Sequence, residues 1–258
     1  MNMKTKLNIL LGLLIITALW TTGCRKYPRI VGNNQVASED RGLVSFDQVK
    51  NEGTFNVIVK QGANYSAVVE AESNLIPHIR TLVNGNTLVI DTRENLKNYQ
   101  PMNIYVTAPT ITGITLSGSG YMLADSIYSE NMSVEISGSG KIEGYIDADY
   151  SLARISGSGD IYLECYTNSL DARISGSGNL YVNGVGNDNQ FTISGSGQIH
   201  GYNFEQNICN ARISGSGDMF LNVEEKLNVD ISGSGSIYYI GDPQMNISIT
   251  GSGKVYNQ

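Results

Sequence analysis

The chain has 258 residues, enough for one or two domains, and carries 17 Lys and Arg against 24 Asp and Glu, a net charge of −7. This acidic balance argues against a nucleic-acid-binding protein, which needs a basic surface. Two His and three Cys are too few for a usual zinc module or a disulfide-stapled miniprotein.

The first 23 residues have the pattern of an export signal. Lys4 and Lys6 precede an apolar run over residues 7–20, and small residues follow it. The run ends in TTGC at residues 21–24, which resembles a bacterial lipoprotein signal, in which the Cys receives the lipid. We predict a signal peptide over residues 1–23 and lipid attachment at Cys24. An ordinary signal peptide followed by an incidental Cys is the alternative.

The segment after the signal predicts where the protein resides. Residues 24–41 are polar enough for a lipid-anchored tether. Lys26 stands where an inner-membrane retention signal of the enterobacterial kind would have Asp. We therefore expect an exported, lipid-anchored protein, at the outer membrane or cell surface rather than the inner membrane.

Residues 42–112 read as a β-rich region without a regular repeat. Runs over residues 55–60, 65–70, 87–91 and 102–107 are rich in strand-forming residues and are separated by turns such as Asn84-Gly85. The terminal units of a solenoid are atypical because they must close it. We predict an irregular N-terminal cap or set of first coils here.

Residues 113–258 are a tandem repeat. The sequence Ser-Gly-Ser-Gly begins at Ser117, Ser137, Ser156, Ser175, Ser194, Ser214 and Ser232, and Thr250-Gly-Ser-Gly closes the series, at intervals of 18 to 20 residues. An aliphatic residue precedes every motif and another follows two places after it. Both columns have the same parity, so period-2 geometry places them on one face of an extended strand, with the glycines at a corner or narrowing of that face.

The repeat predicts an all-β fold. Glycine pairs interrupt every helical pattern, and a unit of about 19 residues is too short for a helix pair. One coil of a single-stranded parallel β-helix fits this length. We expect the right-handed form because parallel crossovers overwhelmingly take that hand.

The sequence predicts no catalytic residue, metal site or cofactor. The repeated serines lack the Gly-x-Ser-x-Gly elbow and a His in register, so we expect outward serine ladders that bond from coil to coil. Asp160 and Asp218 fill too few positions of their column for a calcium-binding roll. A carbohydrate-active β-helix enzyme, which would need grouped carboxylates, is an alternative.

A charged column lies directly before the aliphatic one. It predicts ion pairs of Glu135 with Arg154 and of Arg212 with Asp230, and a like-charge contact of Arg154 with Arg173. Cys165 and Cys209 have the inward parity in different coils and columns, and we expect buried free thiols.

An aromatic column is the predicted ligand contact. Three places after each motif the chain has Leu123, Glu143, Tyr162, Tyr181, His200, Phe220, Tyr238 and Tyr256, all on the outward parity. The six from Tyr162 to Tyr256 predict an exposed stripe of rings along the rod. Such a stripe fits a glycan or a protein partner, and it also fits a ladder that only stabilises neighbouring coils.

The order of FNV at residues 55–57, QG at 61–62, NGNTLVI at 84–90 and IYV at 104–106, followed by the Ser-Gly-Ser-Gly series, resembles the head GIN domain family of putative auto-transporter adhesins. The resemblance covers residues 42–258 as one domain and implies a β-helical lipoprotein.

We therefore expect a non-enzymatic envelope adhesin that is held to the membrane by its lipid and binds a glycan or a surface protein, with no nucleic-acid partner. A purely structural envelope component is the remaining alternative. The sequence does not fix the oligomeric state.

Overall fold

The computed structural model describes residues 29–258, so the predicted signal peptide and Cys24 lie outside the described residues. The described chain is almost entirely β-structure, with one short 3-10 turn, η1 (Ile76–His78). None of its helices is long and apolar enough to cross a membrane. The strands are β1 (Arg29–Val31), β2 (Val36–Arg41), β3 (Gln48–Asn51), β4 (Asn56–Gln61), β5 (Ser66–Glu72), β6 (Arg80–Asn84), β7 (Thr87–Asp91), β8 (Asn95–Lys97), β9 (Asn103–Ala108), β10 (Gly113–Leu116), β11 (Tyr121–Ile136), β12 (Lys141–Ile155), β13 (Asp160–Ile174), β14 (Asn179–Ile193), β15 (Gln198–Ile213), β16 (Met219–Gly233), β17 (Ser236–Ile240), β18 (Gln244–Gly251) and β19 (Lys254–Asn257).

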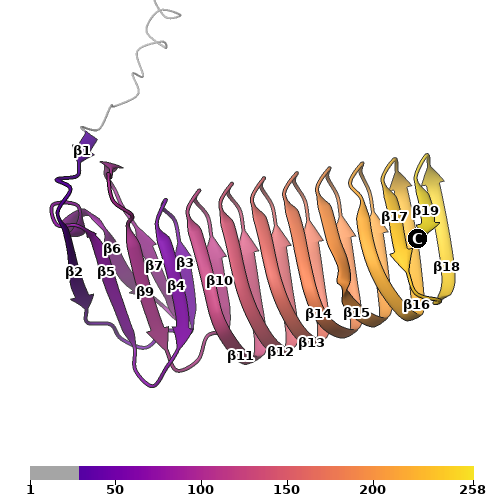
Figure 1. The fold of residues 1–258 in the computed structure, drawn as a ribbon, viewed down its shortest axis with the longest axis horizontal. Coiled ribbons are helices and arrows are strands. Elements are labelled where there is room, and N and C mark those ends of the chain that lie inside the picture. Colours follow the sequence, from indigo (N-terminus) through magenta and orange to yellow (C-terminus); the bar gives the residue numbers. More distant parts are fainter. Residues whose placement is uncertain (1–28) are drawn as a thin grey trace, which may run out of the picture.

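The repeat region forms a rod of stacked parallel coils (Figure 1). Each strand from β11 to β15 runs from the end of one glycine-serine motif to the start of the next, so one long, bent strand makes one coil. Neighbouring coils pair in parallel, with Ile136 opposite Ile155 and Ile155 opposite Ile174. The predicted β-solenoid is confirmed, with about eight turns.

The interior of the rod is built from the predicted aliphatic columns. The residues that end β11 to β15, and Ile231 in β16, each stand directly before a motif and are at most 1% exposed. So are seven of the residues two places after a motif: Met122, Ile142, Ile161, Leu180, Ile199, Met219 and Ile237. Each fully buried aliphatic side chain contributes about 1.5–3 kcal/mol relative to an exposed one. Since the same positions recur in every coil, stacking extends one continuous apolar core.

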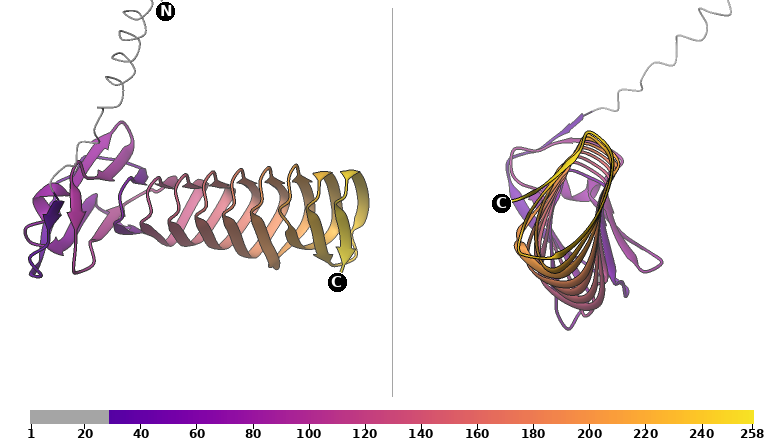
Figure 2. Two further views of the ribbon diagram at one scale, coloured as in Figure 1. Left: turned by 90° about the horizontal axis from the view of Figure 1, so that it is seen from above. Right: turned by 90° about the vertical axis from the view of Figure 1, so that its right-hand side faces the viewer.

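The glycines stand where adjacent coils approach most closely. A Cβ on Gly178 would lie 2.0 Å from the carbonyl oxygen of Gly159 in the preceding coil. The glycines therefore form the corner of each coil, which the end-on view in Figure 2 shows as stacked bends. Across this corner the backbone N–H of Ser177 donates to the carbonyl of Gly157 at 3.0 Å. The motif serines thus bond from coil to coil as expected, through their backbone N–H groups, and the hydroxyl of Ser156 adds a bond to Ile136 O at 3.4 Å.

The N-terminal region closes one end of the rod. β7 pairs in parallel with β3, and β9 with β4. β3 in turn pairs with β10, and β4 with β11, so irregular first coils continue the stack. Antiparallel strands then cover them: β6 pairs with β7, β5 with β9, and β2 with β5. Part of the segment predicted as a tether is thus folded, because β1 pairs with β8 and β2 joins the cap.

Glu72 fastens the cap. Its buried carboxylate accepts backbone N–H bonds from Asn34, from Tyr99 at 2.7 Å and from Gln100 at 3.3 Å. Burial raises the pKa of Glu72, but the three backbone N–H groups outweigh it and the net pKa is lowered. The ionised carboxylate therefore joins the N-terminal segment, β5 and the loop before β9.

Candidate functional site

The structure brings all six predicted aromatic residues together in one stack. Ring centroids are 4.5 Å apart for Tyr162–Tyr181 and for Tyr181–His200, and 4.9 to 5.2 Å apart for the next three pairs, which continue through Phe220 and Tyr238 to Tyr256. Interplanar angles of 3° to 14° make the rings nearly parallel. This spacing matches the distance between hydrogen-bonded coils.

Stacking along the rod occupies the faces of these rings. Each inner ring has a neighbour on both faces, and Lys141 Nζ lies over the Tyr162 ring, 4.5 Å from its centroid. Five of the six side chains are half-buried, and only Tyr256 is exposed, at 38%. The column is therefore less exposed than the sequence predicts, and it offers ring edges rather than faces. A ligand contact by these residues stays a prediction.

The N-terminal end of the stack is held by polar contacts. Tyr121 Oη donates to Glu143 Oε2 at 2.7 Å, and Lys141 forms an ion pair with the other oxygen of Glu143. Burial and the Glu143 bond raise the pKa of Tyr121 to about 12. Within the stack, burial lowers the pKa of His200, so its imidazole is neutral at pH 7.

A second face of the rod carries rows of polar side chains, which we call the polar face. Its residues stand in two registered columns on the later half of each coil. The first is Ser133, Leu152, Asp171, Gln190, Asn210, Asn228 and Asn246, and the second is Glu135, Arg154, Arg173, Thr192, Arg212, Asp230 and Ser248. Four successive coils therefore present a side-chain amide at the same position.

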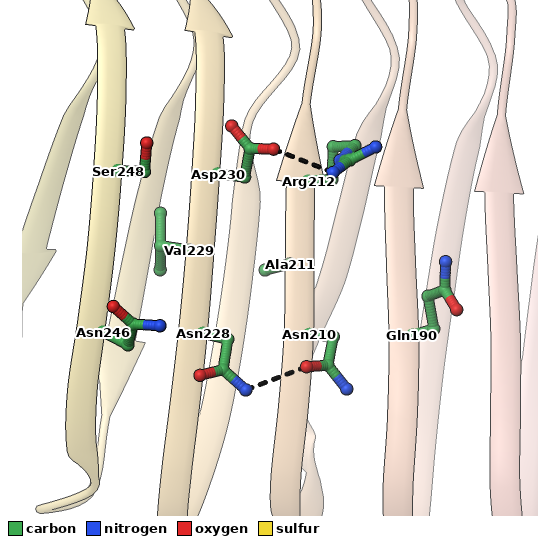
Figure 3. A pocket seen from close by; sticks show the side chains of 9 residues that line it. All are labelled: Gln190, Asn210, Ala211, Arg212, Asn228, Val229, Asp230, Asn246 and Ser248. Carbon is green, nitrogen blue, oxygen red and sulfur yellow. Dashed lines mark hydrogen bonds and ion pairs between the residues drawn. The ribbon is translucent and has the colours of Figure 1, made fainter.

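The polar face is hollowed at the C-terminal half of the rod (Figure 3). A depression of about 410 Å³ lies over the coils of β14 to β18, between the amide column and the column of Arg212 and Asp230. Asn228 Nδ2 donates to Asn210 Oδ1 at 2.8 Å, and Arg212 pairs with Asp230 at 2.9 Å. Asn210 Nδ2 also donates to Asp188 Oδ1 at 3.5 Å, and Gln190, Asn210 and Asn246 are exposed.

A second depression continues the same face toward the cap. It has a volume of about 380 Å³ and is lined by residues of β11, β12 and β13, among them Ser133, Leu152 and Asp171. Tyr150, at its border, is 59% exposed. The two hollows lie along the first column, one toward each end of the repeat region, and the one nearer the cap is the less polar.

The predicted ion pairs of the second column are confirmed. Glu135 and Arg154 lie 3.8 Å apart, and Arg212 and Asp230 2.9 Å apart. Arg154 does stand opposite Arg173, whose guanidinium is neutralised by Asp171 in the neighbouring column. Exposed pairs of this kind contribute little to stability, so their main effect is to fix the positions of side chains on the face.

Sequence reasoning missed the amide column. Its signal is present, because reading the residue four places before each motif gives Gln190, Asn210, Asn228 and Asn246 in succession.

The remaining reactive groups are structural. Cys165 and Cys209 are buried free thiols, as predicted, and burial raises the pKa of Cys165 to about 11 and that of Cys209 further. Residues 29–258 contain no cluster of His, Cys, Asp and Glu that could hold a metal ion.

Comparison with known proteins identifies the family. A family model described as "Putative auto-transporter adhesin, head GIN domain" matches residues 45–243. The chain belongs to this family. The resemblance found in the sequence is therefore confirmed.

Solved structures share the fold. A crystal structure of a putative lipid binding protein from Parabacteroides distasonis aligns with a TM-score of 0.84 and 24% identity, covering 90% of this chain and 100% of that one. A putative adhesin from Parabacteroides merdae gives 0.84 at 17% identity, covering 89% of this chain and 99% of that one. A putative adhesin from Bacteroides fragilis gives 0.68 at 22%, covering 89% and 100%. No curated protein matches.

These identities establish the fold alone. Membership of an adhesin-head family indicates an adhesin-like role for a surface or exported protein, and it suggests a binding protein rather than an enzyme.

Proposed function

We propose that this protein is a non-enzymatic adhesin of the cell envelope that binds a glycan through its polar face. The observation that carries the proposal is the row of four amides on successive coils, Gln190, Asn210, Asn228 and Asn246, along the hollow of about 410 Å³. Amides donate and accept hydrogen bonds at once, as sugar hydroxyls do. The row repeats every 4.8 Å or so along the rod, which suits an extended polymer that crosses several coils.

The chemistry of this face favours a glycan over a protein. The centre of a protein interface is apolar or aromatic, with few charged groups. Here Leu152 and Tyr150 are the large apolar side chains that reach the surface, since Met132, Val229 and Ala211 at the floor of the hollows are buried, and the other lining side chains are amides, hydroxyls and charges. The aromatic stack is the weaker candidate, because its ring faces are already in contact with each other.

Charge pairing on the same face supports binding without hydrolysis. Glycoside cleavage uses two carboxylates placed on either side of the bond. Glu135, Asp171 and Asp230 each lie against an arginine. We accordingly prefer an adhesin to a carbohydrate-active enzyme, and a ligand-binding surface to a purely structural envelope component.

We also propose that the protein is a lipoprotein anchored through Cys24 at the outer membrane or cell surface. The lipoprotein-like signal supports this, and so does the position of β1 at the capped end of the rod, away from the C-terminal coils (Figure 1). Metabolic labelling with a radioactive fatty acid should mark the full-length protein and not Cys24→Ser. Equal labelling of both would refute the anchor.

Binding to a broad panel of glycans and envelope polymers tests the proposed function. The form beginning at Arg25, which keeps every described strand, would be compared with Asn210→Ala/Asn228→Ala. We expect the variant to lose at least about fivefold in affinity, since two lost hydrogen bonds cost about 1–3 kcal/mol.

A matched control is available on the neighbouring strand pair, β14 and β15. Asn207 Nδ2 donates to Asn187 Oδ1 at 2.9 Å, which is the same coil-to-coil bond outside the hollows. Asn187→Ala/Asn207→Ala should bind like the unaltered protein. No binding to any polymer, or equal losses in both double variants, would contradict the proposal.

A further inference from the structure

The C-terminal end of the rod carries an unpaired sheet edge. β18 pairs with β16 and β19 with β17, and no described strand pairs with the opposite edge of either (Figure 1). Ile247 and Ile249 are 48% and 40% exposed, whereas their counterparts one coil earlier, Val229 and Ile231, are 4% and 0% exposed. The last coil therefore leaves backbone hydrogen-bonding groups and the end of the apolar core open.

The two ends of the rod differ in how their edges are protected. Proteins keep edge strands from pairing by placing charges or Pro in them. At the N-terminal end, β2 contains Glu39, Asp40 and Arg41, and it lies in the antiparallel cap that covers the first coils. At the C-terminal end, β18 has the sequence QMNISITG, without a charge or a Pro, and β19 has Lys254 alone. Asp242 and Pro243 directly precede β18, so the charge and the Pro of this coil lie beside the open strand and not within it.

We propose that this edge binds the same edge of a second copy, joining two rods C-terminal end to C-terminal end. A surface that pairs with itself about a two-fold axis needs no complementary partner, and two strands with so few charges do not repel each other. Pairing satisfies the open backbone groups and buries Ile247 and Ile249 of both copies. The exposed outer side of Tyr256, at the end of the stack, is covered as well.

The structure also argues against the other way of stacking two rods. A head-to-tail arrangement would place the open edge on the parallel coils at the N-terminal end, which β5 and β6 already cover in the antiparallel sense. The assembly is therefore a closed pair rather than a filament.

The geometry of the pair bears on adhesion. The two N-terminal ends lie at opposite extremes of a rod of twice the length. With each copy anchored by the lipid proposed above, on which this step rests, the pair connects two membranes rather than two neighbouring proteins in one membrane. The pairing itself does not depend on the anchor or on a glycan.

Sedimentation equilibrium of the form beginning at Arg25, without lipid or glycan, tests the pairing. We expect a monomer–dimer equilibrium at concentrations up to about 100 μM, which corresponds to weak but specific association. Ile247→Lys places a charge on the open end of the core and should shift the protein to monomer. Asn210→Lys, which adds the same charge in the middle of the rod, should leave the dimer unchanged.

Hydrogen exchange locates the contact without a substitution. Amides of residues 244–257 should become at least about tenfold better protected when the protein is concentrated from the monomeric to the dimeric range. A monomer at every concentration would overturn the proposal. So would a dimer whose protection appears on the polar face or the cap, or one that Ile247→Lys leaves intact.

Discussion

Replacing Gly178 by Ala should destabilise the rod strongly, because its corner has no room for a methyl group. The added Cβ would lie 2.0 Å from Gly159 O and 2.9 Å from Ile155 Cγ2. Carbon and oxygen in contact need a little over 3 Å, so one coil would have to move about 1 Å away from the next. The bonds across this corner, such as Ser177 N–H to Gly157 O at 3.0 Å, would then exceed hydrogen-bond length.

The expected cost follows from these two effects. Overpacking a close contact costs about 1–3 kcal/mol, and two weakened backbone bonds add about 1–2 kcal/mol, for a total of about 2–5 kcal/mol. Thermal and urea unfolding followed by the β-sheet signal in circular dichroism would measure it, since a loss of 1 kcal/mol lowers the melting temperature by about 2–4 °C in a chain of this size.

Two other glycines provide graded controls. At Gly201 the nearest atoms to an added Cβ are Phe220 O at 3.3 Å and Val182 Cγ1 at 3.4 Å, so a small cost is expected. At Gly42 nothing lies within 4 Å, and Ala should be neutral or stabilise by up to about 1 kcal/mol through the unfolded chain. If Gly178→Ala were as stable as Gly42→Ala, the close coil-to-coil approach inferred from the corner would be wrong.

Three further predictions follow from the cap, the stack and the core. The pKa of Glu72 in the folded protein is lowered from 4.5, so the stability that its carboxylate contributes is complete above pH 4.5 and is lost as the pH falls through the lower folded pKa. The difference in melting temperature between the protein and Glu72→Gln should therefore close in acid, and a constant difference would contradict this. The Tyr181 ring stacks on two neighbours and the Tyr256 ring on one, so Tyr181→Ala should lower the free energy of unfolding by about 2–4 kcal/mol, more than Tyr256→Ala does. Equal losses would rule out the stack as scaffolding. In the form beginning at Arg25, Cys165 and Cys209 should not react with a thiol reagent at pH 8 until urea unfolds the chain, and rapid labelling of the folded protein would show that they are not buried.

The repeat made much of this fold predictable. A column with a fixed parity and a fixed interval, such as the Ile before each motif, can only stack on its own copies, so the interior and the register followed from the sequence. The positions of Cys165 and Cys209 and the pairing of Arg212 with Asp230 followed from the same rule.

What lay outside the repeat was not predictable in the same way. The antiparallel pairing of β2 with β5 has no periodic signal, and it incorporated a segment that composition alone described as a tether. Parity placed Tyr181 on the outside of its strand, but it could not show that the ring lies flat against Tyr162 and His200, because rotamers and coil spacing decide that contact. The polar face arises only when Asn210 and Asn228 are aligned by the actual register.

A direct comparison of the two outward faces tests the central claim. Binding to the glycan and polymer panel would be measured for the form beginning at Arg25, for Asn210→Ala/Asn228→Ala on the polar face and for Tyr238→Ala on the stack. We predict that the polar-face variant loses binding and that the stack variant, once its circular dichroism spectrum is found unchanged, retains it. Binding that survives the loss of both amides and disappears with Tyr238 would place the contact on the aromatic column and contradict this account.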